Sequence, residues 1–484
     1  MSEAKDTQEQ PKVEISVENF GPIAEANIDL RPLTVFVGPS NTGKTYFATL
    51  VYALHGAFYD LSGSGLLSLL EPEKAMNLLK ELLKNLSISE GEIQDLQKKL
   101  STKGRPFKLS DLPEEIRKRL LVIIRNRDFF RIELHEELKN CFDLNSISEL
   151  ISLTEEQRNE IPILLKVSDE NQVYWNIKIS VSDTEVKLDT STNRGMVLLP
   201  QRWSVTESFI DENSVRIRGY TYPLRKGKYY LPAARSGIMQ SHRIIASSLV
   251  TRSTRVGLEQ FEIPTLSGVI ADFMQKIILY DEKKRPNAEI TYLAKTLESD
   301  VLAGQIHLKS STSGYPDFRY LPQGADEEMS LNQASSMVSE LAPLVLFLRS
   351  GIKPGDTLII EEPEAHLHPG AQAGMAVILA RLVRAGVKVI ITTHSDWLLQ
   401  EIGNLILEGL IEDKTDEPAS WLLPEEVGAW HFQKDKPVKE IAFHPRRGFS
   451  PKDYHDVAEG LYNRSVNLQQ KYEKQKGESR SEST

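Results

Sequence analysis

The feature that most constrains the fold is the stretch "VFVGPSNTGKT", residues 35–45. A run of apolar and β-branched residues leads into Gly38, and four further residues precede Gly43, Lys44 and Thr45. This is the pattern of a P-loop, which joins a buried strand to a helix. A glycine-rich turn without a ligand is the alternative. The spacing and its strand–helix setting together favour a phosphate-binding loop in an α/β fold.

Each part of this loop has a chemical task. The glycines let backbone N–H groups turn toward an anion, because no Cβ is in the way. Lys44 reaches the β- and γ-phosphates, and the Thr45 hydroxyl ligates Mg²⁺. The helix that follows presents the positive end of its dipole to the phosphates. The residues predicted to bind the nucleotide are Gly38, Pro39, Ser40, Asn41, Thr42, Gly43, Lys44 and Thr45.

Composition narrows the functional classes. Apolar residues make up 40% and charged residues 26% of the 484 residues, as in ordinary globular proteins. The formal net charge of -10 argues against a protein coated with nucleic acid, although a local basic groove is compatible with it. The one cysteine, Cys141, excludes an intramolecular disulfide and a multi-cysteine metal site.

The compartment follows from what the sequence lacks. The opening "MSEAKDTQEQPK" is polar and does not resemble a signal peptide. The longest apolar candidate, "MAVILARLV", is interrupted by Arg381 and is too short to span a membrane. We therefore expect a cytoplasmic protein that does not insert into a membrane.

Periodicity divides the chain into five parts. Strands are predicted at 12–17, 25–30 and 34–37, and the stretch 66–164 is expected to be mostly helical. Alternating segments between 167 and 224 indicate further strands. The resulting predicted parts are a disordered N-terminus (1–11), an N-terminal lobe (12–58), a mixed helical and β insertion (59–225), a C-terminal lobe (226–445), and a C-terminal helix with a disordered tail (446–484).

A second motif supplies acids to the predicted site. "TLIIEE" is an apolar strand that ends in Glu361 and Glu362. In a P-loop protein the first acid holds the Mg²⁺ shell, here through water, and the second orients and deprotonates the attacking water. Adjacent side chains at a strand end point to different sides, so the two roles are geometrically separable. A strand that ends in a solvated acidic turn is the alternative.

A third motif, "IITTHSD", ends another predicted strand with His394 at its tip. A histidine in this position can donate a hydrogen bond to a γ-phosphate and so sense it. A lone histidine after a strand usually has no such role. The assignment of His394 therefore depends on the two other motifs.

The three motifs together resemble an ABC-type ATPase head. "GPSNTGKT", "LIIEEPEAHLHP" and "TTHSD" are similar to the stand-alone prokaryotic AAA15/AAA21 ATPases, which are related to the OLD, RecF and SMC proteins. The resemblance covers residues 12–56 and about 228–405. It implies a P-loop NTPase fold with an ABC-type head, ATP and Mg²⁺ as cofactors, and ATP hydrolysis with Glu362 and His394 as catalytic residues.

The resemblance also implies a signature segment that binds the γ-phosphate of a partner subunit's ATP. "NQASSMVSELAPLVLFLRS" precedes the acidic strand, and Ser336 is the match for the signature serine. Met337 and Ser339 stand where the family has glycine and glutamine. A capped core helix is the alternative. Arg235 in "LPAARSG" is expected in a loop after a strand. There it either contacts phosphate or stabilises the subunit junction, or it forms a structural ion pair.

One P-loop and one signature segment per chain imply a homodimer with two ATP molecules at a two-fold junction. ATP would hold the dimer closed and hydrolysis would release it. Our first hypothesis is a switch that controls a separate effector, a nuclease or toxin, in a defence or stress system. The alternative is a RecF- or SMC-like DNA maintenance ATPase that binds DNA. A transporter ATPase is disfavoured because "EEPEAHLHP" replaces the transporter pattern.

Overall fold

The computed structural model places most of the two predicted lobes and part of the predicted insertion. Within the chain it describes these residues: 12–61, 128–151, 160–168, 173–182, 186–190, 224, 227–253, 266–282, 287–309, 315–411, 420–449 and 451–481. The helices predicted between 66 and 127 and the strands predicted between 191 and 223 lie outside these ranges.

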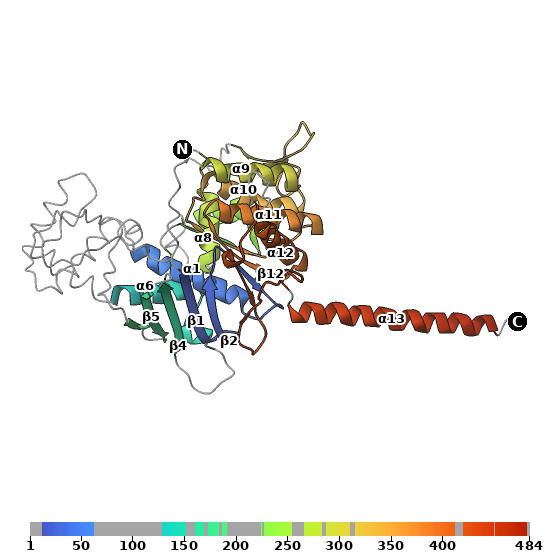
Figure 1. The fold of residues 1–484 in the computed structure, drawn as a ribbon. Helices are drawn as coiled ribbons and strands as arrows, with labels where there is room; N and C mark the ends of the chain where they lie inside the picture. The colour runs from blue at the N-terminus through green and yellow to red at the C-terminus, as the bar shows by residue number, and fades with distance from the viewer. Residues whose placement is uncertain are drawn as a thin grey trace, which may run out of the picture.

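A six-stranded sheet forms the centre of the molecule (Figure 1). Its order is β14-β13-β3-β12-β11-β7, and every neighbouring pair is parallel except β13 with β14. The bounds are β3 Leu33–Val37, β7 Lys228–Leu231, β11 Thr357–Glu361, β12 Lys388–Thr393, β13 Val427–His431 and β14 Lys439–Glu440. β3 and β11 are buried along their whole length, as expected for parallel strands covered on both faces. The predicted α/β class is confirmed.

Alternate residues of these strands belong to two hydrophobic cores. Val35 and Val37 pack into one core, whereas Phe36 packs into the other. Helices cover the first face, and α1 with a second sheet covers the other (Figure 1). The helix bounds are α1 Lys44–Leu61, α6 Asp128–Phe142, α7 Arg235–Ser253, α8 Gly268–Ile278, α9 Ala288–Thr296, α10 Ser336–Ser350, α11 Pro369–Arg384, α12 Asp396–Leu410 and α13 Lys452–Ser481.

The second sheet crosses the boundary predicted between the N-terminal lobe and the insertion. Its order is β2-β1-β4-β5-β6, with bounds β1 Lys12–Phe20, β2 Ile23–Leu30, β4 Ile161–Ser168, β5 Val173–Val181 and β6 Val186–Thr190. β4 pairs antiparallel with β1, so strands of the predicted insertion continue the sheet of the N-terminal lobe. The helical expectation up to 164 is wrong from Ile161 onward. Every second residue of "IPILLKVS" is buried, which is the period of a strand.

The remaining elements are smaller or lie at the periphery. A three-stranded sheet joins β8 Gly304–Lys309, β9 Asp317–Pro322 and β10 Met329–Ser330, and short helical turns are η2 Ile147–Leu150, η4 Leu297–Leu302 and η5 Pro424–Glu426. α13 projects from the body (Figure 1) and continues to Ser481, so the disorder predicted for most of the tail is wrong. Its many Lys, Glu and Gln residues are good helix formers. No helix in the described ranges is long and apolar enough to cross a membrane.

Candidate functional site

The loop between β3 and α1 has the backbone that its glycines predict. Gly38, Asn41 and Gly43 have φ angles of 141°, 61° and 99°. A Cβ on Gly38 would lie 2.1 Å from the carbonyl oxygen of Phe432, and one on Gly43 would lie 2.4 Å from Cγ1 of Ile23. Glycine is therefore required at both positions by the backbone and by the packing behind the loop. Alternating conformations of this kind turn successive N–H groups toward one concave surface, which suits an anion.

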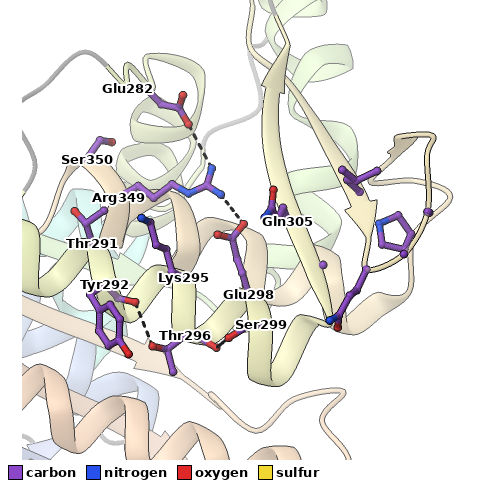
Figure 2. Close-up of a pocket in the computed structure, with 16 residues that line it drawn as sticks. Glu282, Thr291, Tyr292, Lys295, Thr296, Glu298, Ser299, Gln305, Arg349 and Ser350 are labelled. Carbon is purple, nitrogen blue, oxygen red and sulfur yellow. Dashed lines mark hydrogen bonds and ion pairs between the residues drawn. The ribbon is translucent and has the colours of Figure 1, made fainter. Parts of the chain in front are cut away.

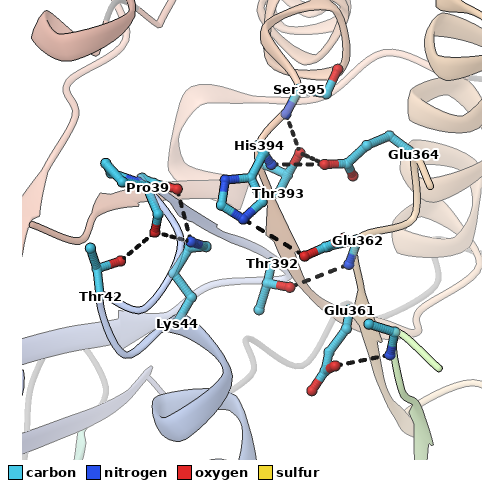
Figure 3. A network of polar contacts seen from close by, with 12 residues as sticks. Pro39, Thr42, Lys44, Glu361, Glu362, Glu364, Thr392, Thr393, His394 and Ser395 are labelled. Carbon is cyan, nitrogen blue, oxygen red and sulfur yellow. Dashed lines mark hydrogen bonds and ion pairs between the residues drawn. The ribbon is translucent and has the colours of Figure 1, made fainter. Parts of the chain in front are cut away.

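Lys44 spans this loop from its buried position at the start of α1. Its Nζ donates to the carbonyl oxygens of Gly38 and Pro39, at 2.8 and 2.6 Å (Figure 3). The Thr42 hydroxyl also donates to the Pro39 carbonyl, at 2.8 Å. Thr45, the second residue of α1, is exposed beside the loop, as are Ser40 and Asn41. The ammonium and the exposed hydroxyl thus lie at the same helix end, where the helix dipole is positive.

The parallel register brings the three motifs to one edge of the sheet. Glu361 at the end of β11 is level with Thr392 of β12, and Thr393 is level with Val37 of β3. The carboxyl ends of β3, β12 and β11 therefore lie side by side, which is where open α/β sheets bind ligands. Figure 3 shows Lys44, Glu361, Glu362 and His394 around this edge.

Glu361 is buried and held by donors of β7 and the turn after it. The Tyr230 hydroxyl donates to Oε1, and the backbone N–H of Ala233 donates to Oε2 at 2.9 Å. Burial raises the pKa of the Glu361 carboxyl, and the two hydrogen bonds oppose that shift. Tyr230 also lies 3.4 Å from the hydroxyl of Thr49 on α1. Tyr230 could not be selected from the sequence, because its contact with Glu361 joins residues far apart in the chain.

Glu362 and His394 face each other on the open side of the edge. Glu362 has a φ of 44°, and its N–H donates to the Thr392 carbonyl at 2.9 Å. Its Oε1 lies 3.7 Å from Nε2 of His394, with the Glu362 and His394 side chains 44% and 33% exposed (Figure 3). Burial lowers the pKa of His394, Lys44 lowers it further, and Glu362 raises it. The neutral imidazole has one ring N–H to donate.

Glu364 is a site residue that the sequence reasoning did not select. Its Oε1 accepts hydrogen bonds from the Thr393 hydroxyl and the His394 backbone N–H, both at 2.7 Å (Figure 3). Burial raises the pKa of its carboxyl. Ser395, which caps α12, donates to Oε1 of Gln372 at 2.5 Å. The sequence signal that could have identified Glu364 is that it is the third acid in "EEPE", which follows the two acids already assigned to the site.

Arg235 lies in a helix and not in the predicted loop, because it is the first residue of α7. Its guanidinium is 1% exposed and pairs with Oε1 of Glu340 at 2.7 Å. Arg235 therefore forms a structural ion pair, which is one of the roles expected for it from the sequence. Ser336 is exposed at the first position of α10, and Ser335 caps that helix by accepting from the Val338 N–H at 3.4 Å.

The side chains at the edge suit Mg²⁺ beside a nucleotide. No cluster of three or more His, Cys, Asp or Glu side chains in the described ranges could hold a metal ion alone. Mg²⁺ in nucleotide sites takes phosphate and water oxygens plus one or two protein oxygens. The Thr45 hydroxyl and the Glu361 carboxylate are hard oxygen donors of that kind, and they would hold the ion with the phosphates.

A cavity of about 960 Å³ lies apart from this edge, between η4, α9, β8 and β9 (Figure 2). Arg349, near the end of α10, lines it and bonds to Glu298 and to the Ile306 carbonyl. None of the predicted site residues lines this cavity. It therefore belongs to a different part of the molecule.

Solved structures with a loose overall likeness include SMC head domains and the recombination mediator protein RecF. An Smc head with an extended coiled coil, bound to the C-terminal domain of ScpA from Pyrococcus furiosus, is 10% identical, with a TM-score of 0.39 and coverage of 94% of this chain and 100% of that chain. The Thermotoga maritima SMC head has 9% identity, a TM-score of 0.36 and coverage of 89% and 99%. The recombination mediator protein RecF has 10% identity, a TM-score of 0.35 and coverage of 90% and 99%.

Sequence comparison identifies the family. No curated protein matches the chain. Residues 13–399 of the 484 match the AAA15 family, which is described as an AAA ATPase domain. The match contains all three motifs and the strands that bring them to one edge. The protein belongs to the AAA15 family of P-loop ATPases.

Proposed function

We propose that this ATPase is a cytoplasmic, ATP-driven switch that closes as a homodimer and opens after hydrolysis. The observation that carries the proposal is that the two predicted phosphate-binding features of one chain, the P-loop and the Ser336 end of α10, lie on different elements. The P-loop, Glu362 and His394 share one edge of the sheet. Ser336 begins a separate helix and is exposed there. A helix N-terminus with serine hydroxyls suits a phosphate, and a second copy would supply that phosphate.

In the proposed mechanism each side chain at the sheet edge has one role in binding or hydrolysing ATP. The loop N–H groups and Lys44 bind the phosphates. The Thr45 hydroxyl and the Glu361 carboxylate would help to hold Mg²⁺, which would neutralise phosphate charge when bound. Glu362 accepts the proton of the attacking water, and its open, half-exposed carboxylate is reachable from solvent. His394, neutral because its pKa is lowered, donates one hydrogen bond to the γ-phosphate.

The first test compares two variants. Lys44→Ala is expected to lose ATP binding and therefore dimer closure. Glu362→Gln retains the shape of the side chain but replaces one carboxylate oxygen by an NH2 group and so removes the base. This variant should bind ATP, stop turnover and accumulate as a dimer. Light scattering after size-exclusion chromatography with Mg-ATP measures the mass. Normal hydrolysis by Glu362→Gln would show that the base is another residue.

The switch is proposed to control a separate effector protein, a nuclease or toxin, in a defence or stress system. A pull-down of Glu362→Gln from its host with Mg-ATP, against Lys44→Ala as the control, tests this. An effector polypeptide that is retained only by Glu362→Gln would support the proposal. Nuclease-sensitive DNA without such a polypeptide would favour the RecF- or SMC-like alternative of DNA maintenance.

A further inference from the structure

Arg235 connects three segments that meet behind the catalytic edge. Its NH1 group donates to the carbonyl oxygens of Pro232 and Glu361, at 3.1 and 2.5 Å, and its NH2 group donates to the Glu362 carbonyl at 3.0 Å. Its Nε donates to the Glu340 carbonyl at 3.2 Å, in addition to the ion pair with that residue's carboxylate. One guanidinium therefore binds the end of β11 and the first turns of α10 together.

Burial makes this connection rigid. Arg235 is 1% exposed and Glu340 is 0% exposed. A buried arginine binds in a fixed planar geometry, and losing either partner would leave an uncompensated charge in the interior. Movement of the first two turns of α10, which contain Glu340, must therefore carry Arg235 with it or break the pair. α7 and α10 are also joined by the bond from Gln240 Nε2 to the Ser339 hydroxyl, at 3.2 Å.

Arg235 also contacts the backbone of Glu362, whose conformation is unusual. Glu362 is not glycine, yet it has a φ of 44°, a conformation that persists only where its surroundings impose it. Its N–H is held by Thr392 and its carbonyl oxygen by Arg235. Both peptide groups of Glu362 are therefore hydrogen-bonded, and Arg235 is one of the two residues that hold the backbone from which the Glu362 side chain projects.

We propose that Arg235 is a positioning residue that couples the N-terminal turn of α10 to Glu362 of the same chain. Occupation of the Ser336 end by a second copy's nucleotide then aligns the base that hydrolyses this chain's own ATP. The coupling deepens the proposed function and rests on it. It predicts that one ATP site is hydrolytically competent only when the other α10 contact is made.

The test uses the full chain and conservative variants. Arg235→Lys keeps the charge but loses the planar fork, and Glu340→Gln removes the charge at nearly constant shape. Arg349→Lys is the matched control, because Arg349 forms an arginine–glutamate pair with Glu298 at the opposite end of α10. Thermal unfolding checks that each variant is folded, and a fluorescent ATP analogue measures nucleotide affinity.

We expect Arg235→Lys and Glu340→Gln each to lower turnover by about 10- to 100-fold, because small misplacement of a catalytic group has effects of this size. Nucleotide affinity should stay within about twofold, since the P-loop is untouched, and Arg349→Lys should retain turnover within about twofold. Unchanged turnover in Arg235→Lys would overturn the proposal. If Arg235→Lys does not fold, Glu340→Gln decides the same question.

A double-mutant cycle tests the coupling itself. Ser336→Ala should lower turnover in the wild-type chain. It should have little further effect in Arg235→Lys, because the coupling between α10 and Glu362 is already lost in that variant. Losses that multiply, or no loss in Ser336→Ala alone, would overturn the coupling. ATP-dependent dimerisation of Glu362→Gln is measured separately. A dimer with multiplying losses contradicts only the coupling. A monomer contradicts the proposed dimer and with it the trigger from a second copy, and non-multiplying losses in a monomer would leave only a link within one chain between Ser336 and Glu362.

Discussion

At the scale of single residues, His55 gives the molecule a defined sensitivity to acid. It lies buried on α1, and burial together with nearby Lys228 lowers its pKa from 6.5 to about 3. The unfolded chain takes up a proton below pH 6.5, whereas the folded chain resists it until about pH 3. The contribution of His55 to stability is therefore fully present above pH 6.5 and is lost as the pH falls through this window.

We expect the free energy of unfolding to fall by roughly 3 kcal/mol between pH 7.5 and 4.5 through His55 alone, at about 1.36 kcal/mol per pKa unit. His55→Leu should lack this part of the acid response. Urea unfolding at both pH values measures it, and His444→Leu, at an exposed histidine, is the control. An equal pH response in wild type and His55→Leu would show that His55 does not titrate in this way.

At the scale of elements, the turn after β11 braces the start of α12. Glu364 accepts hydrogen bonds from the Thr393 hydroxyl and the His394 backbone N–H, so it holds the His394 backbone in position at the carboxyl edge of the sheet. Glu364→Ala would leave two donors without their acceptor and loosen this turn. We expect turnover to fall about 10- to 100-fold. ATP affinity should change by less than about threefold, because Lys44 and the loop are untouched.

Steady-state kinetics with ATP titration separates these effects on kcat and binding. Glu401→Ala in α12 is the control, because Glu401 accepts from Asn404 on the same helix, away from the turn. A loss of ATP affinity as large as the loss of turnover would show that Glu364 supports the loop and not His394. An unchanged turnover would remove His394 positioning from the role of Glu364.

The same elements show how far sequence reasoning reaches. β3, β11 and β12 were predictable because short apolar runs ending in glycine, acid or histidine leave few alternatives. β4 was missed because Ile161, Leu164 and Leu165 of "IPILLKVS" also fit the i, i+3, i+4 spacing of a helix, and its strand partner β1 lies far away in sequence. Arg235 was misplaced because nearby Pro232 and Gly237 indicate a loop. Its contacts to Glu340 and Glu362 depend on tertiary packing, which periodicity does not encode.

At the scale of the whole molecule, the two phosphate-binding features can be separated genetically. A chain with Lys44→Ala keeps the Ser336 end of α10, and a chain with Ser336→Arg keeps its P-loop. If each ATP is bound between two copies, neither variant can build a complete site in its own homodimer. A mixed dimer, however, contains one intact P-loop facing one intact α10.

We therefore expect complementation of dimer formation when both variants also carry Glu362→Gln to prevent hydrolysis. With Mg-ATP each variant alone should elute near the chain mass of 54.6 kDa, and the mixture should give a species of twice that mass. This species should hold one ATP per two chains, because only one of its two sites is complete. Isotopically labelled ATP and light scattering measure the stoichiometry. A dimer in either variant alone would place the chain–chain contact outside the ATP sites, whereas a mixture that stays monomeric would argue against the bridging nucleotide. Restoration only on mixing requires two chains to share one ATP, which a self-contained site in one chain does not produce.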